Sequence, residues 1–167
     1  MPFSPLPTMI VDSLTDLTPS FLEQHEIKLL MLDFDNTIVP YTTNTPTVDM
    51  EVWLRCMVRM GTKLCVVSNS KRERVKIFCR KYGIPCITHA KKPFGKGIKE
   101  CLALFEMEPG RCALVGDQIY TDTLGANGAG VKSILVKAID NHNFWLKARH
   151  VLELPFIFIA RKRRMKL

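Results

Sequence analysis

The stretch that decides the fold is LLMLDFDNTIVPY, residues 29–41, where an apolar run ends in two aspartates. Residues 28–33 have the near-continuous apolar pattern of a strand that is covered on both faces. Asp33 and Asp35 follow with one residue between them, and side chains at i and i+2 of an extended chain project to the same side. Two ionised carboxylates in a dry cleft are costly unless a cation lies beside them. This stretch therefore predicts a buried strand that ends in a cation-assisted carboxylate site.

On the C-terminal side of this stretch, short apolar runs alternate with helical patterns. Such alternation is typical of a mainly parallel sheet with helices on both faces. We therefore predict an α/β fold, a doubly wound three-layer (αβα) sandwich around a five-stranded sheet. The expected strands are residues 28–33, 62–68, 85–90, 111–117 and 133–137, and the expected helices are 47–60, 71–82 and 96–107.

Length and composition restrict the class of protein. A chain of 167 residues can bury a core, and we expect one domain, with a leader (1–27), a catalytic core (28–137) and a C-terminal extension with a basic tail (138–167). A formal net charge of +8 favours an anionic partner. The six cysteines form no C-x-x-C pair and are expected to be reduced. With no visible secretory signal and no apolar run near the ~18 residues of a membrane span, we expect a cytoplasmic protein.

Polar residues follow the other predicted strands as well. Ser68 and Asn69 follow the second strand, Lys92 follows the third, and Asp117 and Asp122 follow the fourth. Ligands of such sheets bind beyond the carboxyl ends of the strands, so we expect these groups to converge. Carboxylates without His or Cys favour Mg²⁺ over zinc. The hydroxyl, the amide and the lysine suit a phosphate group, which Mg²⁺ also accepts as a ligand.

Four motifs carry a resemblance to a known superfamily. They resemble the motifs of the haloacid dehalogenase (HAD) superfamily of phosphatases, and they are DFDNT (33–37), VVSNS (66–70), KKP (91–93) and GDQIYTD (116–122). The segments DLTP before the first strand and GIP at 83–85 extend the resemblance to the YqeG family of class III, capless members. The resemblance implies a HAD-like Rossmannoid fold without a large cap domain. A eukaryotic branch of that group acts on phosphatidylglycerophosphate.

The resemblance also implies a mechanism. Asp33 matches the nucleophile that becomes a phospho-aspartate, and Asp35 matches the general acid that later serves as the base. Asp35 needs a pKa near neutrality for that role. Lys92 matches the lysine that balances charge in the site. The implied activity is hydrolysis of a phosphomonoester.

Binding roles complete the implied site. Ser68 matches the phosphate-binding hydroxyl, and Asn69 is expected either to join it or to act as a turn residue. Asp117 matches a metal ligand, and Asp122 matches a second ligand or an N-cap of the following turn. The expected Mg²⁺ ligands are Asp33, Asp35 through its backbone carbonyl, Asp117 and Asp122.

The expected partner is a phosphorylated substrate, and no nucleic-acid partner is expected. Short intervals between the motifs leave no room for a cap, so a bulky substrate such as a lipid head group suits the open site. Residues 39–47 are predicted to form a small flap hairpin. The apolar and basic residues of 154–167 are expected either to pack on the domain or to contact an anionic membrane at its inner face.

Two other functions fit parts of the pattern. A receiver-like signalling module shares an acceptor aspartate, a hydroxyl and a lysine, but it places its acceptor on the third strand. A non-catalytic scaffold of the same fold is the other alternative, although every catalytic position is filled. The sequence does not indicate an oligomeric state.

Overall fold

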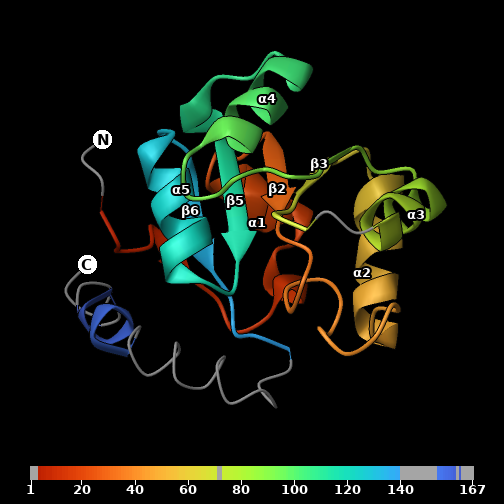
Figure 1. Cartoon of the computed structure of the whole chain (residues 1–167), viewed down its shortest axis with the longest axis horizontal. Helices are drawn as coiled ribbons and strands as arrows, with labels where there is room; N and C mark the ends of the chain where they lie inside the picture. The colour runs from red at the N-terminus through yellow and green to blue at the C-terminus, as the bar shows by residue number, and fades with distance from the viewer. Residues whose placement is uncertain (1–3, 71–72, 140–153, 161, 163–167) are drawn as a thin grey trace.

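A six-stranded parallel sheet forms the centre of the computed structural model, which describes residues 4–70, 73–139, 154–160 and 162 (Figure 1). The strand order is β1-β6-β5-β2-β3-β4. The strands are β1 (Met9–Ile10), β2 (Leu29–Leu32), β3 (Lys63–Val67), β4 (Cys86–Ile87), β5 (Cys112–Gly116) and β6 (Lys132–Leu135). The α-helices are α1 (Pro19–Gln24), α2 (Val48–Arg59), α3 (Glu73–Tyr82), α4 (Lys96–Phe105) and α5 (Leu124–Gly128). Shorter helical turns are η1 (Leu14–Asp16), η2 (Pro109–Arg111) and η3 (Ile119–Thr123).

The predicted mainly parallel α/β sheet is confirmed, with one strand more than expected. The extra strand β1 lies within the expected leader and pairs with β6, where Met9 stands opposite Ile134. The expected strand at 85–90 shortens to two residues, because the chain turns at His89 and Lys91, whose φ angles are 56° and 53°. The turn places the following residue, Lys92, at the carboxyl ends of the strands, where the sequence predicts the site.

Both faces of the sheet are buried, as the apolar pattern predicted. In β2, Leu30 and Leu32 belong to a core cluster that includes side chains of α2 and α3. Leu29 and Met31 belong to the opposite cluster, which includes side chains of α4 and α5. All four side chains are inaccessible to solvent. Helices therefore cover both faces of the sheet, with α2 and α3 on one side and α4 and α5 on the other (Figure 1).

The described residues contain no large cap domain. Helix α2 and strand β3 occupy the interval between the first two motifs, and helix α3 and strand β4 occupy the next. The predicted flap hairpin at 39–47 is wrong, since these residues form turns and bends, with one isolated bridge between Asp35 and Val39. Next to the first motif the described chain thus has a short loop, held by Arg74, rather than a domain.

A further helical segment, residues 154–160, contacts the turn η3 that follows β5. Its Phe156 ring contacts Tyr120 edge to face, with ring centroids 6.4 Å apart. Leu154, Phe158 and Ile159 on this segment remain exposed. No helix in the described part of the chain is long and apolar enough to cross a membrane.

Candidate active site

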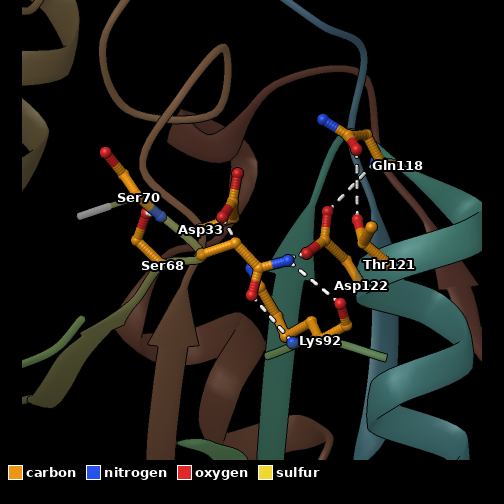
Figure 2. Close-up of polar contacts among 8 residues, drawn as sticks. Asp33, Ser68, Ser70, Lys92, Gln118, Thr121 and Asp122 are labelled. Carbon is orange, nitrogen blue, oxygen red and sulfur yellow. Dashed lines mark hydrogen bonds and ion pairs between the residues drawn. The ribbon is translucent and has the colours of Figure 1, made fainter. Parts of the chain in front are cut away.

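The centre of the site is a buried lysine between two aspartates (Figure 2). Asp33 directly follows β2, and its N–H donates to the carbonyl of Val115 in β5 at 2.8 Å, which fixes it at the sheet edge. The Nζ of Lys92 donates to Asp33 Oδ1 at 2.6 Å and to Asp122 Oδ1 at 2.7 Å. The first, third and fourth motifs therefore meet, as the sequence predicted.

Burial sets the electrostatics of this group. The Lys92 side chain is 1% exposed, and the Asp122 side chain is 3% exposed. Burial raises the pKa of Asp122 to about 6, and the charge of Asp33 adds to this while Lys92 opposes it. Burial alone would lower the pKa of Lys92, but the charges and hydrogen bonds of Asp122 and Asp33 raise it above its ordinary value. Lys92 is therefore a permanent cation at neutral pH.

The turn after β5 is built to bring Asp122 against the sheet. Gly116 has no side chain, and a Cβ atom at this position would collide with the Asp122 carboxylate. The Gln118 N–H donates to Asp122 Oδ2 at 3.2 Å, and Thr121 Oγ1 donates to the Gln118 side chain at 3.1 Å. The glycine and the π-helical turn η3 explain why GDQIYTD places a carboxylate six residues beyond its glycine.

Three carboxylates in the site could hold a cation. Carboxylate oxygens of Asp33, Asp117 and Asp122 lie within 4.8 Å of one another. Asp35 brings a fourth carboxylate to the site. In the ion pairs that the structure describes, Lys92 binds Asp33 and Asp122, and Arg74 binds Asp35. Carboxylate oxygens as donors suit a hard divalent cation such as Mg²⁺.

Asn69 holds the backbone of Lys92. Its Oδ1 accepts from the Lys92 N–H at 2.7 Å, and its Nδ2 donates to the Lys92 carbonyl at 3.0 Å. Both polar atoms of this amide are thus engaged within the protein. The phosphate contact predicted for Asn69 from sequence therefore depends on its backbone N–H or on the second hydrogen of Nδ2.

Ser68 lies at the end of β3 and is 1% exposed. Its N–H donates to the Ile87 carbonyl at 2.9 Å, and its Oγ accepts from the Ser70 N–H at 3.0 Å. This hydrogen bond leaves the hydroxyl hydrogen of Ser68 able to donate to a ligand. Figure 2 shows Ser68 and Ser70 on the side of Asp33 away from Asp122.

Asp35 occupies a different environment from Asp33. Its carboxylate lies outside the three-aspartate cluster and forms an ion pair with Arg74, from the first turn of α3. The metal contact that the resemblance implies for Asp35 is made through its backbone carbonyl and does not involve this carboxylate. Sequence reasoning missed Arg74, although its helical position one turn before the buried Phe78 indicated an inward-facing side chain.

Comparison with known proteins gives the family. The family described as "Mitochondrial PGP phosphatase" matches residues 2–139. A "Probable phosphatase YqeG" from Bacillus subtilis (strain 168) is 36% identical over 131 residues, which are 78% of this chain and 76% of the relative.

Solved structures share the fold. The cobalt-bound form of a deoxy-D-mannose-octulosonate 8-phosphate phosphatase from Haemophilus influenzae has a TM-score of 0.54 at 12% identity, covering 75% of each chain. A HAD family hydrolase from Streptomyces avermitilis has a TM-score of 0.52 at 19% identity, covering 69% of this chain and 75% of its own. With its four motifs joined at one sheet edge, the chain is a phosphatase that shares the fold of HAD family hydrolases, and it belongs to the mitochondrial PGP phosphatase family.

Proposed function

We propose that the protein is a Mg²⁺-dependent phosphomonoester hydrolase that works through a phospho-aspartate on Asp33. The observation that carries this proposal is the buried Lys92 ammonium, 2.6 Å from Asp33 and 2.7 Å from Asp122, beside the carboxylate cluster of Asp33, Asp117 and Asp122. The ammonium is placed to offset the charge of a phosphate group that Asp33 attacks, and the carboxylates are oxygen donors suited to Mg²⁺. Membership of a phosphatase family favours hydrolysis over a receiver-like module or a scaffold.

The chemistry divides into two displacements. Asp33 attacks phosphorus, the bond to the leaving oxygen breaks, and Asp35 gives that oxygen its proton. Asp35, now ionised, takes a proton from water as the water oxygen attacks the phospho-aspartate, and inorganic phosphate leaves. Each cycle restores both aspartates.

Binding groups surround this path. Ser68 donates its hydroxyl hydrogen to a phosphoryl oxygen, while Lys92 offsets the charge of that group. Mg²⁺, held by Asp33, Asp117, Asp122 and the Asp35 carbonyl, would supply further charge neutralisation and in-line orientation of the phosphate. A structural relative that was solved with cobalt bound supports a divalent metal in this fold.

The substrate we propose is a bulky phosphate at a membrane surface, such as phosphatidylglycerophosphate. The family description and the absence of a large cap among the described residues support this choice. Leu154 and Phe158 are 46% and 69% exposed on a segment that packs against Tyr120, three residues from Asp117. An anionic bilayer can bind such an apolar surface together with the basic residues that follow it, so we place the protein in the cytoplasm at the inner face of a membrane.

Hydrolysis of an aryl phosphate tests the reaction. We expect activity with Mg²⁺, none with EDTA, recovery on adding Mg²⁺ back, and none for Asp33→Asn. Turnover in EDTA would contradict the metal-dependent mechanism. A panel of phospholipid, nucleotide, sugar and peptide phosphates then tests the substrate, and a preference for a small sugar phosphate would contradict the lipid assignment.

Vesicle co-sedimentation tests the membrane contact separately. The full chain should bind vesicles that contain anionic lipid and should bind neutral vesicles weakly. The Phe158→Ser variant should bind less tightly and keep its aryl phosphatase activity. Equal binding of the variant and the unchanged chain would exclude this segment as the contact.

A further inference from the structure

We infer that Arg74 is a positioning residue for the reaction, which holds the Asp35 carboxylate toward the leaving group and ties it to the loop at residues 40–47. The inference rests on the proposed function, in which Asp35 is the acid. Arg74 lies outside all four motifs, on helix α3.

The contacts of Arg74 connect three parts of the molecule. Its Nη2 pairs with Asp35. Its Nη1 donates to the Thr43 carbonyl at 2.8 Å and to Asn44 Oδ1 at 3.3 Å, both in the 40–47 loop. Its guanidinium carbon lies 5.2 Å from the centroid of the Phe34 ring, between the two catalytic aspartates in sequence. The Arg74 side chain thus contacts Asp35, the 40–47 loop and Phe34, the residue between Asp33 and Asp35.

These contacts suit an arginine in particular. The guanidinium is planar, so it can stack on a ring while its two terminal nitrogens donate in different directions. A lysine at this position offers one point charge and cannot hold Asp35 and the loop in the same geometry. The Arg74 side chain is 14% exposed, so the contact with Asp35 is only partly open to solvent.

Asp35 needs such support because of where it lies. Its side chain is 20% exposed, at the point where β2 has ended and the chain turns toward Val39. Lys92 is already engaged by Asp33 and Asp122. Without Arg74 the Asp35 carboxylate would sample several rotamers, and an acid that is misplaced by about 1 Å can lose on the order of 10²-fold in rate. The pair therefore pre-organises proton delivery.

Comparing two leaving groups tests this role, because a purely structural role of Arg74 would lower kcat/KM equally for both esters. An alkyl alkoxide needs protonation to depart, whereas p-nitrophenolate departs readily without it. We therefore expect Arg74→Ala to lower kcat/KM for glycerol phosphate by about 10²-fold and for p-nitrophenyl phosphate by less than about tenfold. Because kcat/KM ends at the first irreversible step, it reports phosphoryl transfer to Asp33 and not the later hydrolysis.

Two further variants sharpen the test. Arg74→Lys keeps the charge and most of the stem, and it should lower the ratio of alkyl to aryl kcat/KM by about tenfold. In an Asp35→Asn background, Arg74→Ala should leave this ratio unchanged, because the group that it positions is already lost. Arg80→Ala is the matched control, since Arg80 lies on the same helix, is 71% exposed and pairs with Glu73.

Each outcome decides the inference. Equal losses with both esters, or no loss with either, would overturn it, as would a changed ratio in the Asp35→Asn background. If Arg74→Ala does not fold by circular dichroism, Arg74→Lys decides, and an unchanged ratio in that variant overturns the role. If the unaltered protein hydrolyses neither ester, the proposed function itself fails. If it hydrolyses both and the ratio does not respond to Arg74, only this inference fails.

Discussion

The inner and outer halves of the site use the same residue type in opposite ways. The inner half is Asp33 with Lys92 and Asp122, where both partners of Asp33 are at least 95% buried. The outer half is Asp35 with Arg74, where both side chains are partly exposed and Arg74 also donates to the loop at residues 40–47. In the proposed mechanism the nucleophile lies against a buried cation away from water, whereas the acid, which later serves as the base, keeps access to water beside a cation of its own. Two residues of sequence separation are enough to place aspartates in these two settings.

The largest expected effect separates the two aspartates kinetically. Asp33→Asn should abolish turnover by at least about 10³-fold, and mass spectrometry should detect no phospho-enzyme. Asp35→Asn should still accept phosphate from p-nitrophenyl phosphate, since that leaving group needs little protonation, and should then accumulate phospho-enzyme because the base is missing. A burst from Asp33→Asn, or none from Asp35→Asn, would reverse the assignment.

Removing the inner cation should harm both stability and activity. Lys92→Met keeps the length of the side chain but leaves Asp33 and Asp122 without their shared partner. We expect the free energy of unfolding to fall by about 3 kcal/mol at neutral pH and activity to fall by about 10²-fold or more. Urea denaturation and steady-state kinetics measure these changes. Lys91→Met, at the exposed neighbouring position, should change neither quantity appreciably.

The inner half should also show a pH signature in the metal-free protein. The pKa of Asp122 is about 6 in the folded state against an ordinary 3.8, so the folded protein binds this proton more tightly than the unfolded chain does. The free energy of unfolding should therefore fall as pH rises from about 4 to about 6, by roughly 2 kcal/mol, and this contribution should then level off. Urea titrations in EDTA at pH 4, 5, 6 and 7 measure it. Asp122→Asn should flatten the curve between pH 4 and 6, and an unchanged slope would assign it to another group.

The smallest expected effect concerns Asn69, which hydrogen-bonds to the backbone of Lys92. Asn69→Ala removes the two hydrogen bonds to the Lys92 backbone, which should cost about 1–2 kcal/mol of stability and about tenfold in kcat. Asn69→Asp keeps the acceptor for the Lys92 N–H but loses the donor, so it should lie between Ala and the unchanged protein. A phosphate affinity that falls while kcat is unchanged would instead support a substrate-binding role for the Asn69 side chain.

The inner half could be predicted from sequence, whereas in the outer half Asp35 could be predicted and its partner Arg74 could not. Apolar runs that end in Asp33, Ser68 and Asp117 fix strand ends, and parallel strands bring those ends to one edge whatever the details of the helices. Lys92 follows from the same rule, because it comes shortly after the strand next to β3. This part of the prediction depends only on strand order and direction.

Arg74 and Asn69 were beyond that rule for physical reasons. The partner of Arg74 lies 39 residues earlier in the chain, and their contact depends on the path of the 40–47 loop, where an expected hairpin is instead a set of turns. Asn69 turns toward Lys92 rather than outward because the chain reverses at His89 and Lys91, in left-handed conformations that no local pattern announced. Strand β1, only two residues long, was equally invisible to periodicity.

Strand β1 also has a consequence for how the chain is assembled during synthesis. Met9 and Ile10 pair with Ile134 and Leu135, and the Val11 N–H donates to the Leu135 carbonyl at 3.0 Å. Among the earliest described segments to leave the ribosome, this strand has no partner until some 125 further residues have been translated. The pairing of β1 with β6 therefore joins residues far apart in the sequence, which is a contact of high contact order. It can form only after the strands and helices between β1 and β6 have been synthesised.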